Sequence, residues 1–186
     1  MKLLSKNSTR VFGLIALMGA FSFSASAAEM IQGAFGKKLG DKFDPASAIG
    51  TKKTASGTPM YQFNPESPFR SFSKYYVMIT PATQKIYCIW GTGNVESTDI
   101  GKQEQAVLMS LLKDKYGSAE QPGIFDDLDD SRRFSQGNRY ILTKVTGLDG
   151  LEPVKIEIRY YDKPLQKLAE KERVDTEKTK VDKSGL

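Results

Sequence analysis

Two runs of apolar, β-branched and aromatic residues near the middle of the chain predict the centre of a sheet. These runs cover residues 75–79 and 85–90, and the short polar connection between them contains Pro81. Such a pair of runs is typical of a β-hairpin, and Pro81 has the fixed backbone angle that a turn needs. Neither run alternates cleanly between apolar and polar residues, so we expect both faces of this hairpin to be covered, as in central strands.

Two helices are predicted after this hairpin. The first would start at a cap formed by Ser97, Thr98 or Asp99 and end at Gly117. Its apolar residues recur at helical spacing: Val107, Leu108, Leu111, Leu112 and Tyr116. Asp162 can cap the second helix near the C-terminus. The apolar residues of that helix are expected to face inward: Leu165, Leu168 and Ala169.

The remaining apolar runs predict further strands. Residues 60–63 form one short run, and residues 132–135 and 139–145 form a second hairpin around Gly137. Residues 154–161 alternate most regularly, so we expect that strand to have one solvated face. The resulting order of elements predicts an α+β fold with a single domain, an antiparallel sheet of about five to six strands, and helices packed on one side.

The first 28 residues predict a secretory signal peptide. Basic residues precede a short apolar run at 11–21, and small residues follow it up to Ala27 and Ala28, where we expect cleavage. The alternative, a membrane anchor, would need an apolar run of roughly 20 residues. We therefore expect a bacterial exported protein, periplasmic or secreted, with no membrane span in the mature chain.

The mature chain divides by composition into three parts. Residues 29–59 are rich in Gly, Lys, Ser and Ala and predict an irregular N-terminal arm. Residues 60–172 carry the periodic runs and predict the α+β domain. Residues 173–186 are dominated by charge and predict a tail that extends the last helix and becomes disordered.

Charge and composition exclude several classes of function. The formal charge is +5, and removal of Lys2, Lys6 and Arg10 with the signal peptide leaves 5 minus 3, or +2. This near balance and the expected export argue against nucleic acid as a partner. The chain has no histidine and one cysteine, which excludes a Ser-His-Asp triad, a Cys-His pair and a Cys/His zinc site. The sequence therefore favours a protein without catalytic activity and predicts no cofactor.

One acidic run is a weak candidate for a metal site. Asp127, Asp129 and Ser131 have the spacing of the first ligands of a calcium-binding loop. However, Arg132 occupies the position of the loop glycine, and Asn138 that of the bidentate glutamate. A solvated loop with local ion pairs is the favoured interpretation.

The free thiol of Cys88 has two interpretations. Cys88 shares strand parity with Ile86 and Trp90, so it is a small buried hydrophobic residue if that face is the core. Alternatively, an unpaired cysteine in an oxidising compartment can form a disulfide with another protein.

Aromatic residues are the remaining candidates for a binding site. Tyr75, Tyr87 and Trp90 lie in the first hairpin, and Tyr161 lies on the face of residues 154–161 that we expect to be solvated. Core packing explains most such residues, but an exposed aromatic cluster is suited to partner binding.

The resulting hypothesis is an exported, non-catalytic binding protein, such as an inhibitor or accessory envelope protein. It would bind another envelope or secreted protein through one face of its sheet, with basic pairs at 37–38 and 52–53 contributing. The alternatives are a hydrolase of an envelope polymer that uses paired carboxylates, or a calcium-stabilised envelope protein.

Overall fold

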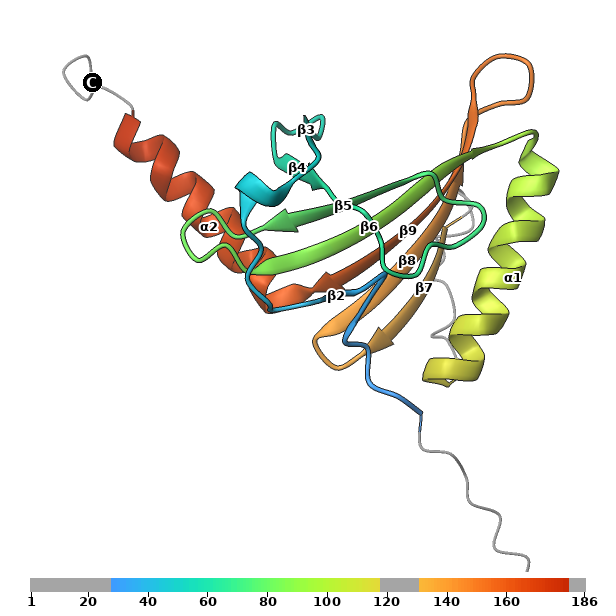
Figure 1. The fold of residues 1–186 in the computed structure, drawn as a ribbon, viewed down its shortest axis with the longest axis horizontal. Helices are drawn as coiled ribbons and strands as arrows, with labels where there is room; N and C mark the ends of the chain where they lie inside the picture. The colour runs from blue at the N-terminus through green and yellow to red at the C-terminus, as the bar shows by residue number, and fades with distance from the viewer. Residues whose placement is uncertain (1–27, 118–130, 181–186) are drawn as a thin grey trace, which may run out of the picture.

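The computed structural model describes residues 28–117 and 131–180, which are organised around a seven-stranded antiparallel sheet (Figure 1). The strand order is β3-β4-β5-β6-β9-β8-β7. The strands of this sheet are β3 Gly50–Lys53, β4 Pro59–Gln62, β5 Lys74–Ile79, β6 Ile86–Val95, β7 Ser131–Gln136, β8 Arg139–Thr146 and β9 Val154–Asp162. The other elements are β1 Gly33–Ala34, β2 Lys37–Lys38, the 3-10 helix η1 Pro45–Ser47, α1 Thr98–Tyr116 and α2 Lys163–Lys180.

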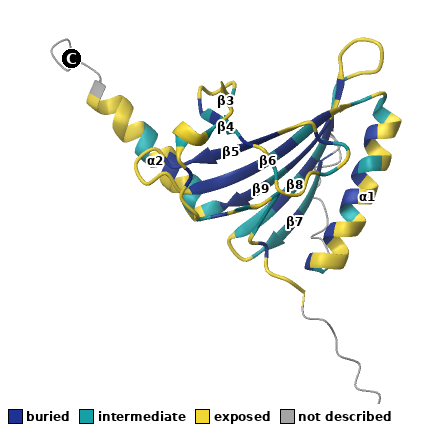
Figure 2. Ribbon diagram, viewed as in Figure 1, coloured by how far each residue is buried: buried dark blue, intermediate teal, exposed yellow. Residues whose placement is uncertain are grey.

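The predicted central hairpin is confirmed. Strands β5 and β6 pair antiparallel, with Tyr76 opposite Trp90, and β6 pairs on its other side with β9. Figure 2 shows that these three strands carry most of the buried residues of the sheet. Both faces of the hairpin are covered for much of its length, as the lack of alternation predicted.

A β-bulge in the hairpin changes which side chains share a face. Met78 is opposite Cys88, but Ile79 is opposite Ile86, so Tyr87 is an extra residue in β6. Ile86 consequently packs on one face of the sheet, while Tyr87 and Cys88 both pack on the other. The predicted shared parity of Cys88 and Ile86 is therefore wrong, because a bulge shifts the alternation by one residue.

The two helices pack on opposite faces of the sheet, so the prediction that the helices lie on one side is wrong. Leu108 and Leu112 of α1 belong to a first cluster of buried residues with Tyr160, whereas Ala169 of α2 belongs to a second cluster with Tyr161. Tyr160 and Tyr161 are consecutive in β9, and consecutive strand residues point to opposite faces. The regular alternation of β9 predicts one solvated face, but α2 covers the end of that face.

The sheet has more strands than the five to six predicted, because β3 has no apolar signal. Its sequence is Gly-Thr-Lys-Lys, and its side chains are mostly exposed. It forms a strand at the sheet edge by pairing with β4, where Lys52 lies opposite Met60. A strand held by backbone pairing at an edge needs no apolar periodicity.

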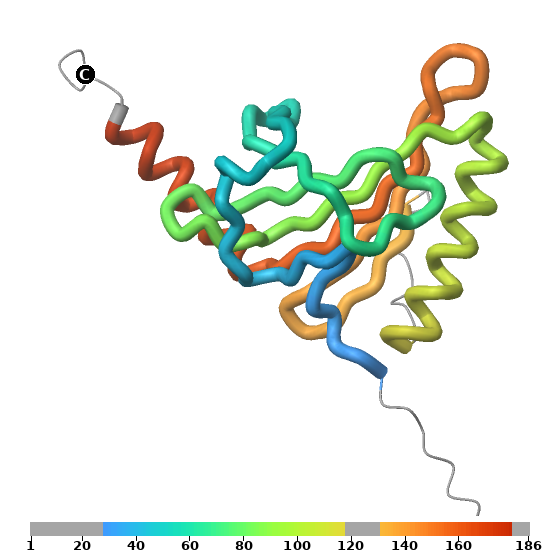
Figure 3. The backbone as a smooth tube through the Cα atoms, in the orientation of Figure 1, coloured from blue at the N-terminus to red at the C-terminus, as the bar shows by residue number. Residues whose placement is uncertain are grey.

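The N-terminal arm packs across the first cluster. In Figure 3 its blue and cyan segment crosses the strands, and Ile31, Leu39 and Phe43 are buried there. The guanidinium of Arg139 fixes the arm by donating hydrogen bonds to the carbonyl oxygens of Ile31, at 2.9 Å, and Leu39, at 3.3 Å. Part of the range 29–59 thus completes the core, and the rest contributes β3 to the sheet.

Both predicted helix caps are present. The Ser97 hydroxyl accepts from the Ile100 amide at 3.3 Å, and Gly117 ends α1 with a positive φ of 85°. An Asp162 carboxylate oxygen accepts from the Leu165 amide at 3.2 Å at the start of α2. Helix α2 continues to Lys180, well into the range 173–186, and in Figure 1 it runs beyond the end of the sheet.

No helix in the described part of the chain is long and apolar enough to cross a membrane. The predicted signal peptide lies outside the described residues except for Ala28.

Candidate functional site

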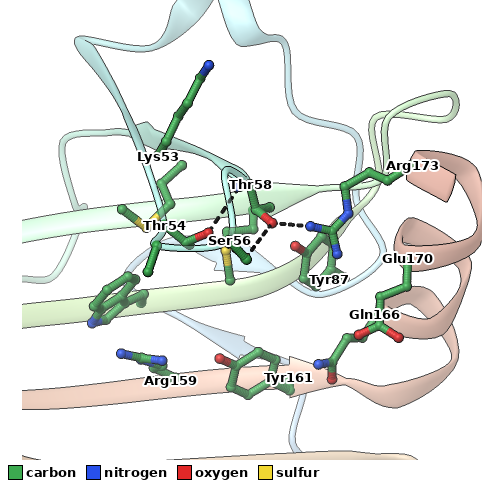
Figure 4. A pocket seen from close by; sticks show the side chains of 14 residues that line it. Lys53, Thr54, Ser56, Thr58, Tyr87, Arg159, Tyr161, Gln166, Glu170 and Arg173 are labelled. Carbon is green, nitrogen blue, oxygen red and sulfur yellow. Dashed lines mark hydrogen bonds between the residues drawn. The ribbon is translucent and has the colours of Figure 1, made fainter. Parts of the chain in front are cut away.

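A cavity of about 610 Å³ opens over the second cluster, between the β3–β4 hairpin and the first half of α2 (Figure 4). We call it the α2 cavity. It is lined by Lys53, Thr54, Ala55, Ser56, Thr58, Met60, Met78, Tyr87, Trp90, Arg159, Tyr161, Gln166, Glu170 and Arg173. Its volume lies within the range of about 300–1,000 Å³ that is typical of ligand pockets.

Aromatic rings and flexible methionine side chains form the floor of the cavity. The bulge in β6 turns Tyr87 onto this face, and Tyr161 arrives from β9. Tyr161 is held by a stacked contact with Tyr140, with ring centroids 4.7 Å apart and an interplanar angle of 16°. Met60 and Met78 complete the floor, and methionine side chains adapt to irregular apolar partners.

The walls are polar and connected to each other. Arg173 of α2 donates a hydrogen bond to the hydroxyl of Thr58 on the hairpin, as Figure 4 shows. The Thr58 amide donates to the Thr54 hydroxyl at 3.0 Å, and the Thr54 and Ser56 hydroxyls are 2.9 Å apart. The hairpin and α2 are therefore joined across the cavity, which restricts the relative movement of its two walls.

Arg159 lies over the ring of Trp90 at the side of the cavity. Its guanidinium carbon is 4.0 Å from the centroid of the Trp90 ring, and its Nη2 is 2.5 Å from Oε2 of Glu157. Burial lowers the pKa of Arg159, but Glu157 and Tyr161 raise it more, so the net pKa is above its ordinary value. The guanidinium is thus charged, and contacts with Trp90 and with the carboxylate of Glu157 hold it in place.

Two buried donors beside the cavity have no hydrogen-bond partner in the described part of the chain. They are Nε1 of Trp90 and Nε of Arg159. A buried donor without an acceptor costs about 1–3 kcal/mol. A ligand that brings an acceptor to this point, with a small shift of either side chain, would remove that cost.

The charge of the lining favours an anionic ligand. Lys53, Arg159 and Arg173 carry three positive charges, and Glu170 carries one negative charge, so the net charge of the lining is 3 minus 1, or +2. Opposite charge on a ligand increases its rate of association and its specificity.

The structure brings together three of the four predicted aromatic binding residues. Trp90, Tyr87 and Tyr161 line the α2 cavity, although Tyr161 is only 8% exposed rather than pointing into solvent. Tyr75 does not belong to this group. It lies in the first cluster, where its hydroxyl accepts from the Phe69 amide at 2.9 Å.

The tyrosine hydroxyls of the floor are neutral over the physiological pH range. Burial, with a smaller effect of Cys88, raises the pKa of Tyr87 to about 12 although Arg173 lowers it. Burial also raises the pKa of Tyr161 well above its ordinary value. These groups can therefore donate and accept hydrogen bonds, but they are poor general bases near neutral pH.

Cys88 lies beneath the floor and is fully buried. Burial is the main cause that raises the pKa of its thiol from an ordinary value of 9.0 to about 12. This placement favours the interpretation of Cys88 as a small hydrophobic residue over a disulfide with another protein.

We predict that Cys88 does not react with a thiol reagent in the folded protein at pH 8 and reacts rapidly after unfolding in urea. The reason is that the reagent needs an accessible thiolate, whereas in the folded state the thiol of Cys88 is buried and uncharged at this pH. Labelling followed by mass spectrometry checks this result. Rapid labelling of native protein would show that Cys88 is accessible.

The same pKa shift has a defined effect on stability. Because the folded state raises the pKa of Cys88, the neutral thiol contributes stability that is fully present below about pH 9 and is lost as the pH rises through about 12. Replacement of Cys88 with alanine should therefore reduce the loss of stability at alkaline pH.

The metal candidates fall mostly outside the described residues. Asp127 and Asp129 are not described, and Ser131 is a buried residue at the start of β7. Within residues 28–117 and 131–180, no group of three or more His, Cys, Asp or Glu side chains could hold a metal ion. The calcium hypothesis stays a prediction from the sequence.

Sequence reasoning missed the residues that form the walls. Thr58 and Arg173 are 115 positions apart, and neither has a local pattern that predicts their contact. The position of Arg159 can be predicted from the alternation of β9. Arg159 is two residues from Tyr161, so the two side chains lie on the same face of the sheet. No protein-family model, curated protein or solved structure matches the chain, so its function is inferred from its own side chains.

Proposed function

We propose that the chain is an exported, non-catalytic binding protein, periplasmic or secreted, whose partner docks into the α2 cavity. The observation that carries this proposal is a cavity of about 610 Å³ that has an aromatic and methionine floor and a net positive lining. Tyr, Trp and Arg are the residue types that dominate binding energy in interfaces. The partner is another envelope or secreted protein, as the expected signal peptide implies.

The composition of the cavity supports binding rather than hydrolysis. A hydrolase of the alternative class needs two carboxyl groups held about 5–10 Å apart in a cleft. In the described part of the chain, Glu170 is the single carboxylate of the lining, and the neighbouring Glu157 is paired with Arg159. The hydroxyl, arginine and aromatic side chains of the site can hold a partner without acting on it.

A capture experiment that blocks the cavity tests the proposal. Ala55 lines the cavity from the exposed turn of the β3–β4 hairpin, so phenylalanine at this position would fill space without disturbing the core. Wild-type protein is used as bait in an envelope extract, and the retained protein is identified by mass spectrometry. We expect the Ala55→Phe variant to lose that partner.

The matched control is Ala106→Phe, which adds the same ring to an exposed position of α1 on the opposite face of the sheet. This variant should retain the partner as wild type does. Equal retention by both variants would show that the partner does not use the α2 cavity. Loss from both variants would point to a general effect of an added exposed ring.

A further inference from the structure

A second hollow on the same face of the sheet adjoins the α2 cavity. Its volume is about 230 Å³, and it shares Met60 and Trp90 with the α2 cavity. Three lysines line it: Lys52, Lys74 and Lys155. Because the two hollows share two side chains of their lining, they are adjacent, and we call the pair the basic groove.

The strand register places two of these lysines on the same face of the sheet as Trp90. Lys74 lies opposite Thr92, which is two positions from Trp90 on β6. Lys74 and Trp90 therefore point to the same face of the sheet. Lys155 lies opposite Asn94, two positions further along β6 on the same face. Lys74 and Lys155 therefore lie along the part of this face that is away from α2.

This part of the face is open and carries uncompensated positive charge. Lys52, Lys74 and Lys155 are exposed and form no ion pair with any described residue. Glu157 lies between them, but its charge is paired with Arg159. The basic groove holds six basic side chains and two acidic ones, a net charge of 6 minus 2, or +4. Helix α2 covers only the end near Tyr161.

We propose that the basic groove binds an acidic segment of the partner protein, with a large apolar side chain in the α2 cavity and carboxylates on the lysines. This inference rests on the proposed function and names the chemistry of the partner. The positive charge favours carboxylates, and the Met60, Met78 and Tyr87 floor favours an apolar anchor. A polypeptide offers both features side by side, whereas an acidic polysaccharide offers the charge without the apolar anchor.

The fluorescence of Trp90 reports directly on this site, because Trp90 is the only tryptophan in the chain and lines both hollows. The probe is a tryptophan-free synthetic peptide with one phenylalanine followed by a run of glutamates. We expect it to change the Trp90 emission in a saturable way and to bind more weakly as salt increases. A peptide with glutamines in place of the glutamates should bind at least about tenfold more weakly, because exposed charge pairs are lost.

A double variant, Lys74→Gln with Lys155→Gln, should weaken binding of the glutamate peptide by about tenfold. The matched control, Lys42→Gln with Lys113→Gln, makes the same change in net charge at exposed lysines outside the groove and should leave the affinity unchanged. Equal affinity for the glutamate and glutamine peptides would overturn the inference. So would an emission change with polygalacturonate or phosphatidylglycerol vesicles but none with the peptide.

The outcome separates this inference from the proposed function. If Ala55→Phe loses the envelope partner while the lysine double variant retains it fully, the cavity binds a partner, but the inference that the lysines bind an acidic segment of it is refuted. If Ala55→Phe retains the partner and the glutamate peptide still binds with the predicted charge dependence, the groove recognises acidic segments but the captured protein docks elsewhere.

Discussion

Replacement of Ile89 with alanine is expected to remove about 2–5 kcal/mol from the free energy of unfolding. Ile89 has no exposed surface, and its neighbours across the sheet are Val77 on β5 and Tyr160 on β9. The change removes three buried carbon atoms and leaves a cavity at the centre of the first cluster. Since a domain of this size has about 5–15 kcal/mol of stability in total, a large share of it would be lost.

Urea denaturation checks this prediction through the midpoint of unfolding, with the slope expected to stay unchanged. The matched control is Ile49→Ala, because Ile49 is 56% exposed. We expect this control to change stability by less than about 0.5 kcal/mol. Similar losses for the two variants would contradict the placement of Ile89 at the centre of the sheet.

Replacement of Trp90 with alanine is expected to weaken partner binding by about thirtyfold or more. Trp90 lines both parts of the basic groove and supports the guanidinium of Arg159, so its removal takes away apolar contact and frees the arginine. A tryptophan at the centre of an interface typically contributes about 2 kcal/mol or more to binding.

Isothermal titration with the captured partner measures this effect. The Trp90→Phe variant keeps an aromatic ring under Arg159 and should lose less affinity than Trp90→Ala. Leu111→Ala, at a position that is 51% exposed on α1, controls for the opposite face and should bind as wild type does. All three variants must show an unchanged circular dichroism spectrum. Affinity that is equal in Trp90→Ala and wild type would place the partner elsewhere.

Local sequence signals were sufficient to predict several elements. The apolar runs around Pro81 gave the β5–β6 hairpin, and Ser97 and Gly117 gave the ends of α1. Each of these features depends on residues within a few positions of one another, where backbone preference and capping act.

Features that depend on distant contacts could not be predicted in this way. The bulge at Tyr87 requires the register between β5 and β6, which no composition rule encodes. The face on which α2 packs cannot be read from β9 alone, because Tyr160 and Tyr161 point to opposite faces and are equally apolar. It depends on which of these faces α1 covers. The hydrogen bond from Arg173 to Thr58, which joins the walls of the cavity, depends on the strand register and on the position of α2.

The candidate site was consequently predicted only in part. The aromatic residues Trp90, Tyr87 and Tyr161 were identified by type, but their common location follows from the bulge and from α2. The charge of Lys52 indicates a binding role from the sequence, but its place in the groove follows from its pairing with Met60 at the sheet edge.

Hydrogen–deuterium exchange of the protein alone and with its captured partner tests the central claim most directly, that the functional surface is the α2 face of the sheet. We predict slower exchange on partner binding in the β3–β4 hairpin at 53–58 and in the first half of α2, which form the walls of the cavity. Exchange in α1, on the opposite face, should be unchanged. Protection of α1 without protection of the hairpin and α2 would contradict this account.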